Sequence, residues 1–131
     1  MKDADFSKLV AKADADTKAL RKLARRGNAE AMYRLACRAS IDSLGLGGYL
    51  RNLRWAIYWA EKADRAGYKL APLFLGHKYV DSRNPRFDPE KALIYYRRAA
   101  ATGDEYAKEC VADTLKMLKK REPKKKSAGQ K

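Results

Sequence analysis

The chain has 131 residues and a net charge of +14, with 46% hydrophobic and 35% charged residues. This composition predicts one compact globular domain with a heavily charged surface. No run of 18 apolar residues occurs, which argues against a membrane-spanning helix and a membrane partner. The first 18 residues hold four Asp and four Lys without an apolar run, so we expect no signal peptide and a cytoplasmic protein.

Hydrophobic periodicity predicts helices throughout the chain and no strand. Apolar residues at spacings of three and four predict one long first helix, or two helices broken near residues 14–16. This stretch ends at Gly27, a good left-handed C-terminal stop. Asn28 can cap a second helix, which we expect to run to about Ile41. The residues expected to face its interior side are Ala31, Leu35 and Ala36.

A glycine-rich loop at residues 43–49 separates the second helix from a third one, which stops at Gly67. A fourth helix begins near Pro72, because proline fits only in the first turn of a helix. It ends before Pro85. The first four predicted helices therefore alternate with short connections.

Residues 88–90, Asp-Pro-Glu, form a strong helix start. They supply an acceptor cap, a proline at the first helical position and an acid near the positive end of the helix dipole. This fifth helix closes at Gly103, and Asp104 caps a last helix that continues to about Leu118.

Half of the excess positive charge lies in the last 16 residues, which hold eight Lys or Arg and one Glu. Beyond residue 118 the only apolar residue is Ala128. Such a segment cannot bury enough surface to offset its ordering entropy. We therefore predict a helical-repeat domain over residues 1–118 and a basic disordered tail over residues 119–131.

The chain also repeats itself at a period of 36 to 40 residues. A step of 36 relates Gly103, Ala99, Tyr95 and Ala92 to Gly67, Ala63, Trp59 and Ala56, and a step of 40 relates Gly67, Ala71 and Leu75 to Gly27, Ala31 and Leu35. Small residues let helix axes approach closely, and aromatic residues fill the remaining space. A period of this length and composition is typical of a helical solenoid, in which each helix pair is stabilised by stacking on the next.

Residues 71–103 resemble the Sel-one-like repeat family, a relative of the tetratricopeptide repeats. The family pattern is approximately A-x3-L-G-x2-Y, a short loop, then D-x2-K-A-x2-W/Y-Y-x2-A-A-x2-G. Residues 31–67 fit more loosely, with Ala36, Asn52 and Trp55 where Gly, Asp and Lys are usual. The resemblance implies an all-α fold, a right-handed α/α superhelix of antiparallel helix pairs with about two full repeats plus capping helices. It also implies a role in protein interaction.

Residues able to carry catalysis are sparse. His77 is the only histidine, and nothing near it in the sequence makes a base-orienting pair. No spacing of Cys and His typical of a metal site occurs, and the glycines of the 43–49 loop miss the dinucleotide-binding spacing. Cys37 and Cys110 are expected to be free thiols. We therefore expect a protein that is not an enzyme and has no cofactor, metal or small-molecule substrate.

In superhelices related to this family, the first helix of each pair lines the concave face. The positions there that packing does not fix are Tyr33, Arg34, Cys37 and Arg38 in one unit and Leu73, Phe74, His77 and Lys78 in the next. Arginine and aromatic residues are typical of binding hot spots. We therefore predict that an acidic protein or peptide binds there. This chain would then be an adaptor or an inhibitor-type protein, of bacterial or phage origin. Packing of Leu73 and Phe74 between repeats is the alternative.

Trp55 allows two interpretations. It either covers the apolar loop residues Leu44, Leu46 and Leu50 or is an exposed anchor for a partner.

The basic residues support a second hypothesis, which is nucleic-acid binding. They are Arg21, Lys22, Arg25, Arg26, Arg34, Arg38, Arg51 and Arg54 in the helical region and Lys119, Lys120, Arg121, Lys124, Lys125 and Lys126 in the tail. Such clusters attract phosphate with a strong dependence on salt. Solubility and attraction of an acidic protein explain the same charge, and no recognised motif for reading bases is present.

Overall fold

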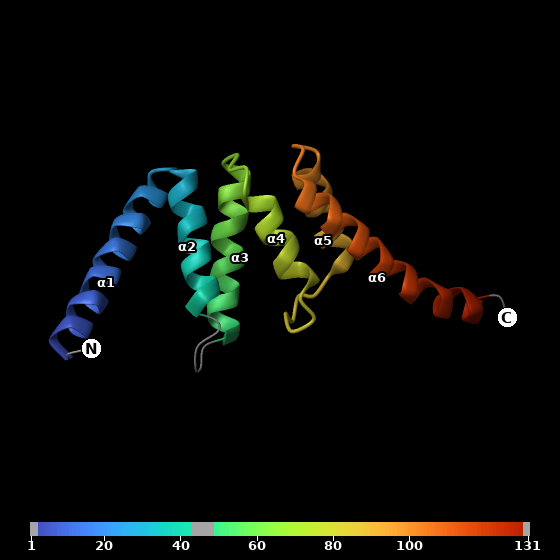
Figure 1. The fold of residues 1–131 in the computed structure, drawn as a ribbon, viewed down its shortest axis with the longest axis horizontal. Coiled ribbons are helices and arrows are strands. Elements are labelled where there is room, and N and C mark those ends of the chain that lie inside the picture. Colours follow the sequence, from blue (N-terminus) through green and yellow to red (C-terminus); the bar gives the residue numbers. More distant parts are fainter. Residues whose placement is uncertain (1–2, 43–48, 130–131) are drawn as a thin grey trace. The chain divides into compact units, whose positions relative to one another are not determined.

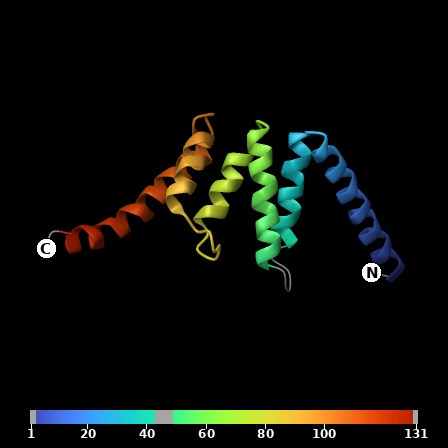
Figure 2. The same ribbon diagram turned by 180° about the vertical axis from the view of Figure 1, so that it is seen from behind.

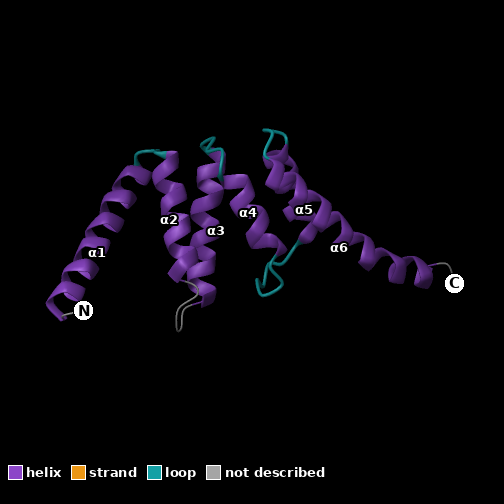
Figure 3. Cartoon of the chain, in the orientation of Figure 1, coloured by secondary structure: helices purple, strands orange, loops and turns teal. Residues whose placement is uncertain are grey.

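The computed structural model describes residues 3–42 and 49–129, and every regular element in these ranges is a helix. The helices are α1 (Asp3–Arg25), α2 (Ala29–Asp42), α3 (Tyr49–Arg65), α4 (Ala71–Val80), α5 (Pro89–Ala100) and α6 (Glu105–Gly129) (Figure 1). No strand occurs in these ranges (Figure 3), which confirms the all-α prediction. The predicted loop at residues 43–49 lies almost wholly outside the described residues.

The chain divides into two compact units, Met1–Tyr68 with α1 to α3 and Lys69–Lys131 with α4 to α6. Within the first unit α2 packs against both α1 and α3, and within the second unit α5 packs against both α4 and α6. Figure 2 shows the helices of each unit from behind. In each unit the middle helix therefore carries most of the packing.

Two glycines end their helices in the way that the sequence predicts. Gly27 and Gly67 have φ of 95° and 88°, in the left-handed region. The N–H groups of Gly27 and the following Asn28 donate to the carbonyls of Ala24 and Leu23, so that the last carbonyls of α1 are satisfied by a Schellman motif. The same arrangement ends α3.

Three side chains cap helix starts where the sequence predicts. The N–H groups of Ala31, Lys91 and Ala107 donate to Asn28, Asp88 and Asp104 over 2.9, 3.0 and 3.2 Å. Each bond satisfies one of the backbone donors that an α-helix leaves unpaired at its start. The beginnings of α2, α5 and α6 are therefore set by local sequence.

The first unit has a core of small and aliphatic side chains from all three helices. Its buried apolar residues are Ala24, Ala31, Met32, Leu35, Ala36, Leu53, Ala56, Ile57, Ala60 and Ala63. The inward positions predicted for α2 are thus confirmed. The alanines of α3 recur at spacings of three and four, as a buried helical stripe requires.

The second unit depends on a close approach between α4 and α5. A Cβ atom at Gly76 would lie 2.5 Å from Cε1 of Tyr96, so only glycine leaves room for this ring. Nearby, the rings of Tyr79 and Tyr95 stack with centroids 5.9 Å apart. Glycine and tyrosine thus complement each other across the contact between the two helices.

Helix α6 continues to Gly129, whereas the sequence predicts a last helix that ends at about Leu118 and a disordered tail from residue 119. Lys, Arg and Glu have high helix propensity, and extending an existing helix needs no new nucleation. The side chains of Lys119, Lys120 and Arg121 are exposed, and those beyond Arg121 are outside the described set. High helix propensity is therefore a sufficient reason for helix in this segment.

Candidate binding site

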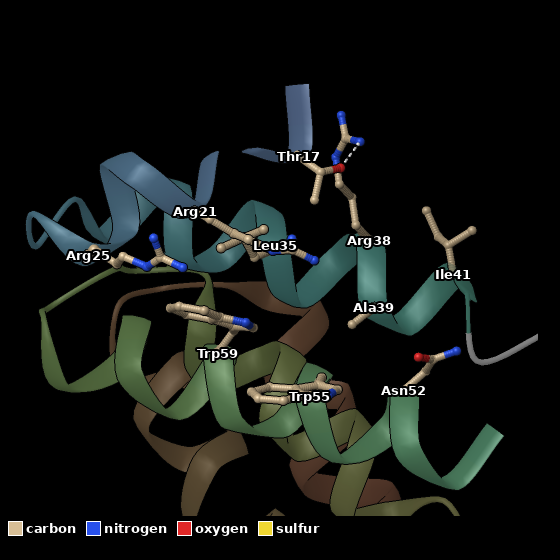
Figure 4. A pocket seen from close by; sticks show the side chains of 10 residues that line it. All are labelled: Thr17, Arg21, Arg25, Leu35, Arg38, Ala39, Ile41, Asn52, Trp55 and Trp59. Atoms are coloured by element: carbon tan, nitrogen blue, oxygen red, sulfur yellow. Dashed lines mark hydrogen bonds between the residues drawn. The ribbon is translucent and has the colours of Figure 1, made fainter. Parts of the chain in front are cut away.

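Three helices of the first unit line a groove of about 590 Å³. Helices α1 and α3 form its walls, and α2, which packs against both, forms its floor (Figure 4). The lining residues are Thr17, Arg21 and Arg25 of α1, Leu35, Arg38, Ala39 and Ile41 of α2, and Asn52, Trp55 and Trp59 of α3. We call this site the Arg–Trp groove.

The wall formed by α1 is cationic. Arg21 and Arg25 are four residues apart, so they share one helix face at a separation of about 6 Å along the axis. Within the described part of the chain neither forms an ion pair, and no carboxylate is among the residues that line the groove. The described lining of the groove therefore carries positive charge and no negative charge.

A third arginine links the floor to this wall. The Arg38 Nη1 group donates a hydrogen bond of 2.9 Å to Thr17 Oγ1 (Figure 4). This bond joins α2 to α1 and holds the guanidinium group beside Thr17. Arg38 therefore both holds the wall in place and adds to the positive charge.

The wall formed by α3 is aromatic. Trp55 and Trp59 are also one helical turn apart, on the side of the groove opposite Arg21 and Arg25 (Figure 4). The Tyr58 ring contacts both indoles edge-on, at centroid distances of 5.4 and 5.2 Å. Lys62 Nζ lies 5.5 Å from the centre of the Trp59 ring, so a cation–π interaction also restrains that side chain.

Two large apolar side chains of the groove are accessible to water. Trp55 is 50% exposed and Ile41, in the last turn of α2, is 68% exposed. Leu44 and Leu46, against which packing of Trp55 was one expectation, lie outside the described residues, as does the side chain of Leu50. The described environment of Trp55 is therefore the groove and the edge of Tyr58.

The structure separates the candidates predicted on α2. Arg38 lines the groove, but Arg34 is exposed outside it and forms an ion pair with Glu30 at 3.0 Å. Tyr33 is half-buried, with its ring 4.9 Å from that of Tyr68. Burial, reinforced by the neighbouring Cys37, raises the pKa of Tyr33 to about 12.

The candidates predicted on α4 belong to the second unit, where all four are half-buried. They are Leu73, Phe74, His77 and Lys78. Lys78 Nζ lies 5.0 Å from the centre of the Phe74 ring, and His77 Nδ1 is 2.7 Å from Tyr96 Oη. Burial, with a smaller effect of Lys78, lowers the pKa of His77, so the ring is neutral at neutral pH.

These α4 residues make contacts inside their own unit. Burial raises the pKa of Tyr96 well above its usual range, so the phenol stays protonated beside His77. The ring of Tyr106 lies 5.7 Å from that of His77. His77 therefore has a packing role in the described structure. Both cysteines are free, as predicted; Cys110 is buried and Cys37 half-buried.

The structure also separates the basic residues that were predicted to bind nucleic acid, since some line the groove and others lie outside it. Among those whose side chains are described, Arg21, Arg25 and Arg38 lie in the groove. Exposed side chains outside it are Lys22, Arg26, Arg54, Lys119, Lys120 and Arg121. Arg51, Lys124, Lys125 and Lys126 lie on described helices, but their side chains are outside the described set.

Sequence reasoning missed Trp59 as a site residue, because the repeat pattern assigned it to packing. Thr17, Ala39, Ile41 and Asn52 were also missed. The spacing of four between Trp55 and Trp59, matched by that between Arg21 and Arg25, was a usable signal. This spacing shows that the residues of each pair share a helix face. It does not show that the two faces lie opposite each other.

Other kinds of site find no support in the described residues. No three of their His, Cys, Asp and Glu side chains gather where a metal ion could bind. None of the described helices combines the length and apolar character needed to cross a membrane. Comparison of the chain with known protein families, with curated proteins and with solved structures gives no match.

Proposed function

We propose that this protein is a non-enzymatic interaction module that binds an acidic segment of a partner protein in the Arg–Trp groove. The observation that carries the proposal is the pairing of a cationic wall with an aromatic wall in one groove. Guanidinium groups bind carboxylates through paired, charge-assisted hydrogen bonds. Arginine and tryptophan are also the residues most enriched in binding hot spots.

We further propose that the helix pairs stack as a right-handed α/α superhelix of the Sel-one-like repeat type, with about two full repeats and capping helices. The sequence repeat supports this arrangement, since equivalent small residues and glycine stops recur at a period of 36 to 40 residues. A module of this kind acts as a cytoplasmic adaptor or as an inhibitor that occupies a partner's surface.

Nucleic acid is the second candidate ligand. Arg21 and Arg25 belong to the basic set and lie opposite two indoles, and aromatic rings beside cations can stack bases of a single strand. The net charge of +14 favours phosphate in general. Affinity for an oligonucleotide that falls steeply between low and physiological salt, and falls again when residues 119–131 are removed, would support this candidate.

Tryptophan emission provides a direct test of the acidic-segment proposal. The sequence contains only two tryptophans, and both line the groove, so their fluorescence reports on this site. We expect a glutamate-rich peptide free of aromatic residues to change the emission with saturation. Replacing Arg21→Gln and Arg25→Gln should weaken binding at least about tenfold, because each charge-assisted bond contributes about 1.5–3 kcal/mol.

The control removes the same charge elsewhere. Arg54→Gln with Arg97→Gln alters two exposed arginines outside the groove and should leave affinity within about twofold. Equal loss in both double variants would show that general charge, and not the groove, attracts the peptide. Far-UV circular dichroism checks that both variants stay folded.

A further inference from the structure

We propose that the segment bound in the Arg–Trp groove carries a large apolar side chain next to its acidic residues. Its carboxylates pair with Arg21 and Arg25, and its apolar side chain lies against Trp55 and Ile41. The inference rests on the proposed function and adds to it the chemistry of the bound motif.

The first argument is that the groove is not uniform along its length. Successive helices of the groove run antiparallel, so α1 and α3 run in the same direction. Arg25, near the end of α1, lies opposite Trp59 in the second half of α3, and Ile41, near the end of α2, lies beside Asn52 at the start of α3 (Figure 4). Arg21 and Arg25 are thus near one end, and Ile41 marks the other. A ligand along the groove meets paired cations first and an apolar surface next.

The second argument is the exposure of that apolar surface. Trp55 and Ile41 are 50% and 68% exposed, and they meet in one groove whose floor includes Leu35 and Ala39. Isolated exposed apolar residues are common on proteins, but clustered ones within a concave site mark a binding surface. An acidic segment without an apolar side chain would leave Trp55 and Ile41 in water.

The third argument favours a peptide over nucleic acid. A single strand carries a phosphate at every nucleotide, whereas the described side chains that line one end of the groove, those of Ile41, Ala39 and Asn52, are uncharged. Arg38, the arginine of α2 that lines the groove, already donates to Thr17. Aliphatic side chains suit a peptide side chain better than they suit a phosphate.

The size of the groove limits the length of the motif. One helical turn, about 10 Å across and 5.4 Å high, fills roughly 400 Å³, compared with about 590 Å³ for the groove. A motif of a few residues therefore occupies it, with one or two carboxylates and one apolar side chain in contact at a time.

The test compares three short peptides that lack Trp and Tyr, with blocked ends. The first has four Glu around one Leu, the second has Ala in place of Leu, and the third has Gln in place of Glu. Tryptophan emission and calorimetry measure binding to the full chain. We expect the Glu–Leu peptide to bind at least about fivefold more tightly than the Glu–Ala peptide, and the Gln peptide to bind more weakly than both.

Two variants test whether the apolar side chain of the peptide contacts Ile41 and Trp55. Ile41→Ala and Trp55→Ala should each reduce affinity for the Glu–Leu peptide about threefold or more and leave the Glu–Ala peptide unchanged; Trp59 still reports in the second variant. Ile94→Ala is the matched control, because Ile94 is 60% exposed on a helix of the other unit. Both isoleucines are exposed, so neither substitution should unfold the protein.

The outcomes separate the two proposals. Equal binding of the Glu–Leu and Glu–Ala peptides would overturn this inference and leave the proposed function intact. Binding of neither acidic peptide would overturn both proposals. Tighter binding of a thymidine oligonucleotide than of the Glu–Leu peptide, with loss in Trp55→Ala, would also overturn both and assign the groove to single-stranded nucleic acid.

Discussion

At the scale of single residues, neighbouring side chains decide which candidates are available to a partner. Arg34 and Arg38 are one turn apart on α2, yet Arg34 pairs with Glu30 in solvent and Arg38 lies in the groove. His77, a surface candidate in the sequence, is engaged with Tyr96 inside its unit. Residue type alone does not separate these cases, because the distinction depends on which helix lies opposite.

The buried environment of His77 predicts a specific response to acid. Its pKa in the folded protein is below the ordinary value of 6.5, so between those two values the unfolded chain binds more protons than the folded one. Stability is therefore complete above about pH 6.5 and falls as the pH drops below it. Thermal unfolding at pH 7.5 and 5.5 should show this loss in the native chain.

His77→Gln tests whether the histidine is the cause. His77 is the only histidine in the sequence. The melting temperature of the variant should therefore fall less between pH 7.5 and pH 5.5 than that of the native chain. The same loss in both proteins would assign the pH dependence to other groups.

At the scale of helices, the contact between α4 and α5 requires glycine at position 76. We predict that Gly76→Ala destabilises the protein by about 1–3 kcal/mol, as overpacking of a core does, since its methyl group would overlap the Tyr96 ring. Urea unfolding measures the change. In a Tyr96→Leu background the same substitution should have a smaller effect, and an equal effect in both backgrounds would refute this explanation.

The sequence predicted the helices well because their signals are local. The stops at Gly27 and Gly67 and the caps at Asn28, Asp88 and Asp104 all function as expected. The extent of α6 differed, because hydrophobic pattern says little about a charged segment in which propensity alone favours helix. Local signals therefore gave element boundaries wherever a cap or a stop was present.

The groove could be predicted only in part. The sequence shows that Arg21 and Arg25 share a face, as do Trp55 and Trp59, because both pairs are four residues apart. The packing of α1 and α3 on α2 determines whether these two faces lie opposite each other. This tertiary relation has no signature within either helix.

At the scale of the whole molecule, the chain combines two three-helix units with a large positive charge. Charge of this size speeds the approach of an acidic partner from any direction. Under the proposed function, selectivity depends on a defined site, for which the first unit provides arginines and indoles in one groove.

The most direct test of that claim is a nitrogen–proton correlation spectrum of the labelled full chain during titration with the Glu–Leu peptide. We predict that the indole N–H signals of Trp55 and Trp59 and the Nε–H signals of Arg21 and Arg25 shift with one saturation curve, while signals of α4, including Phe74, stay in place. Shifts confined to α4 or to residues 119–131, with both indole signals unmoved, would contradict the account.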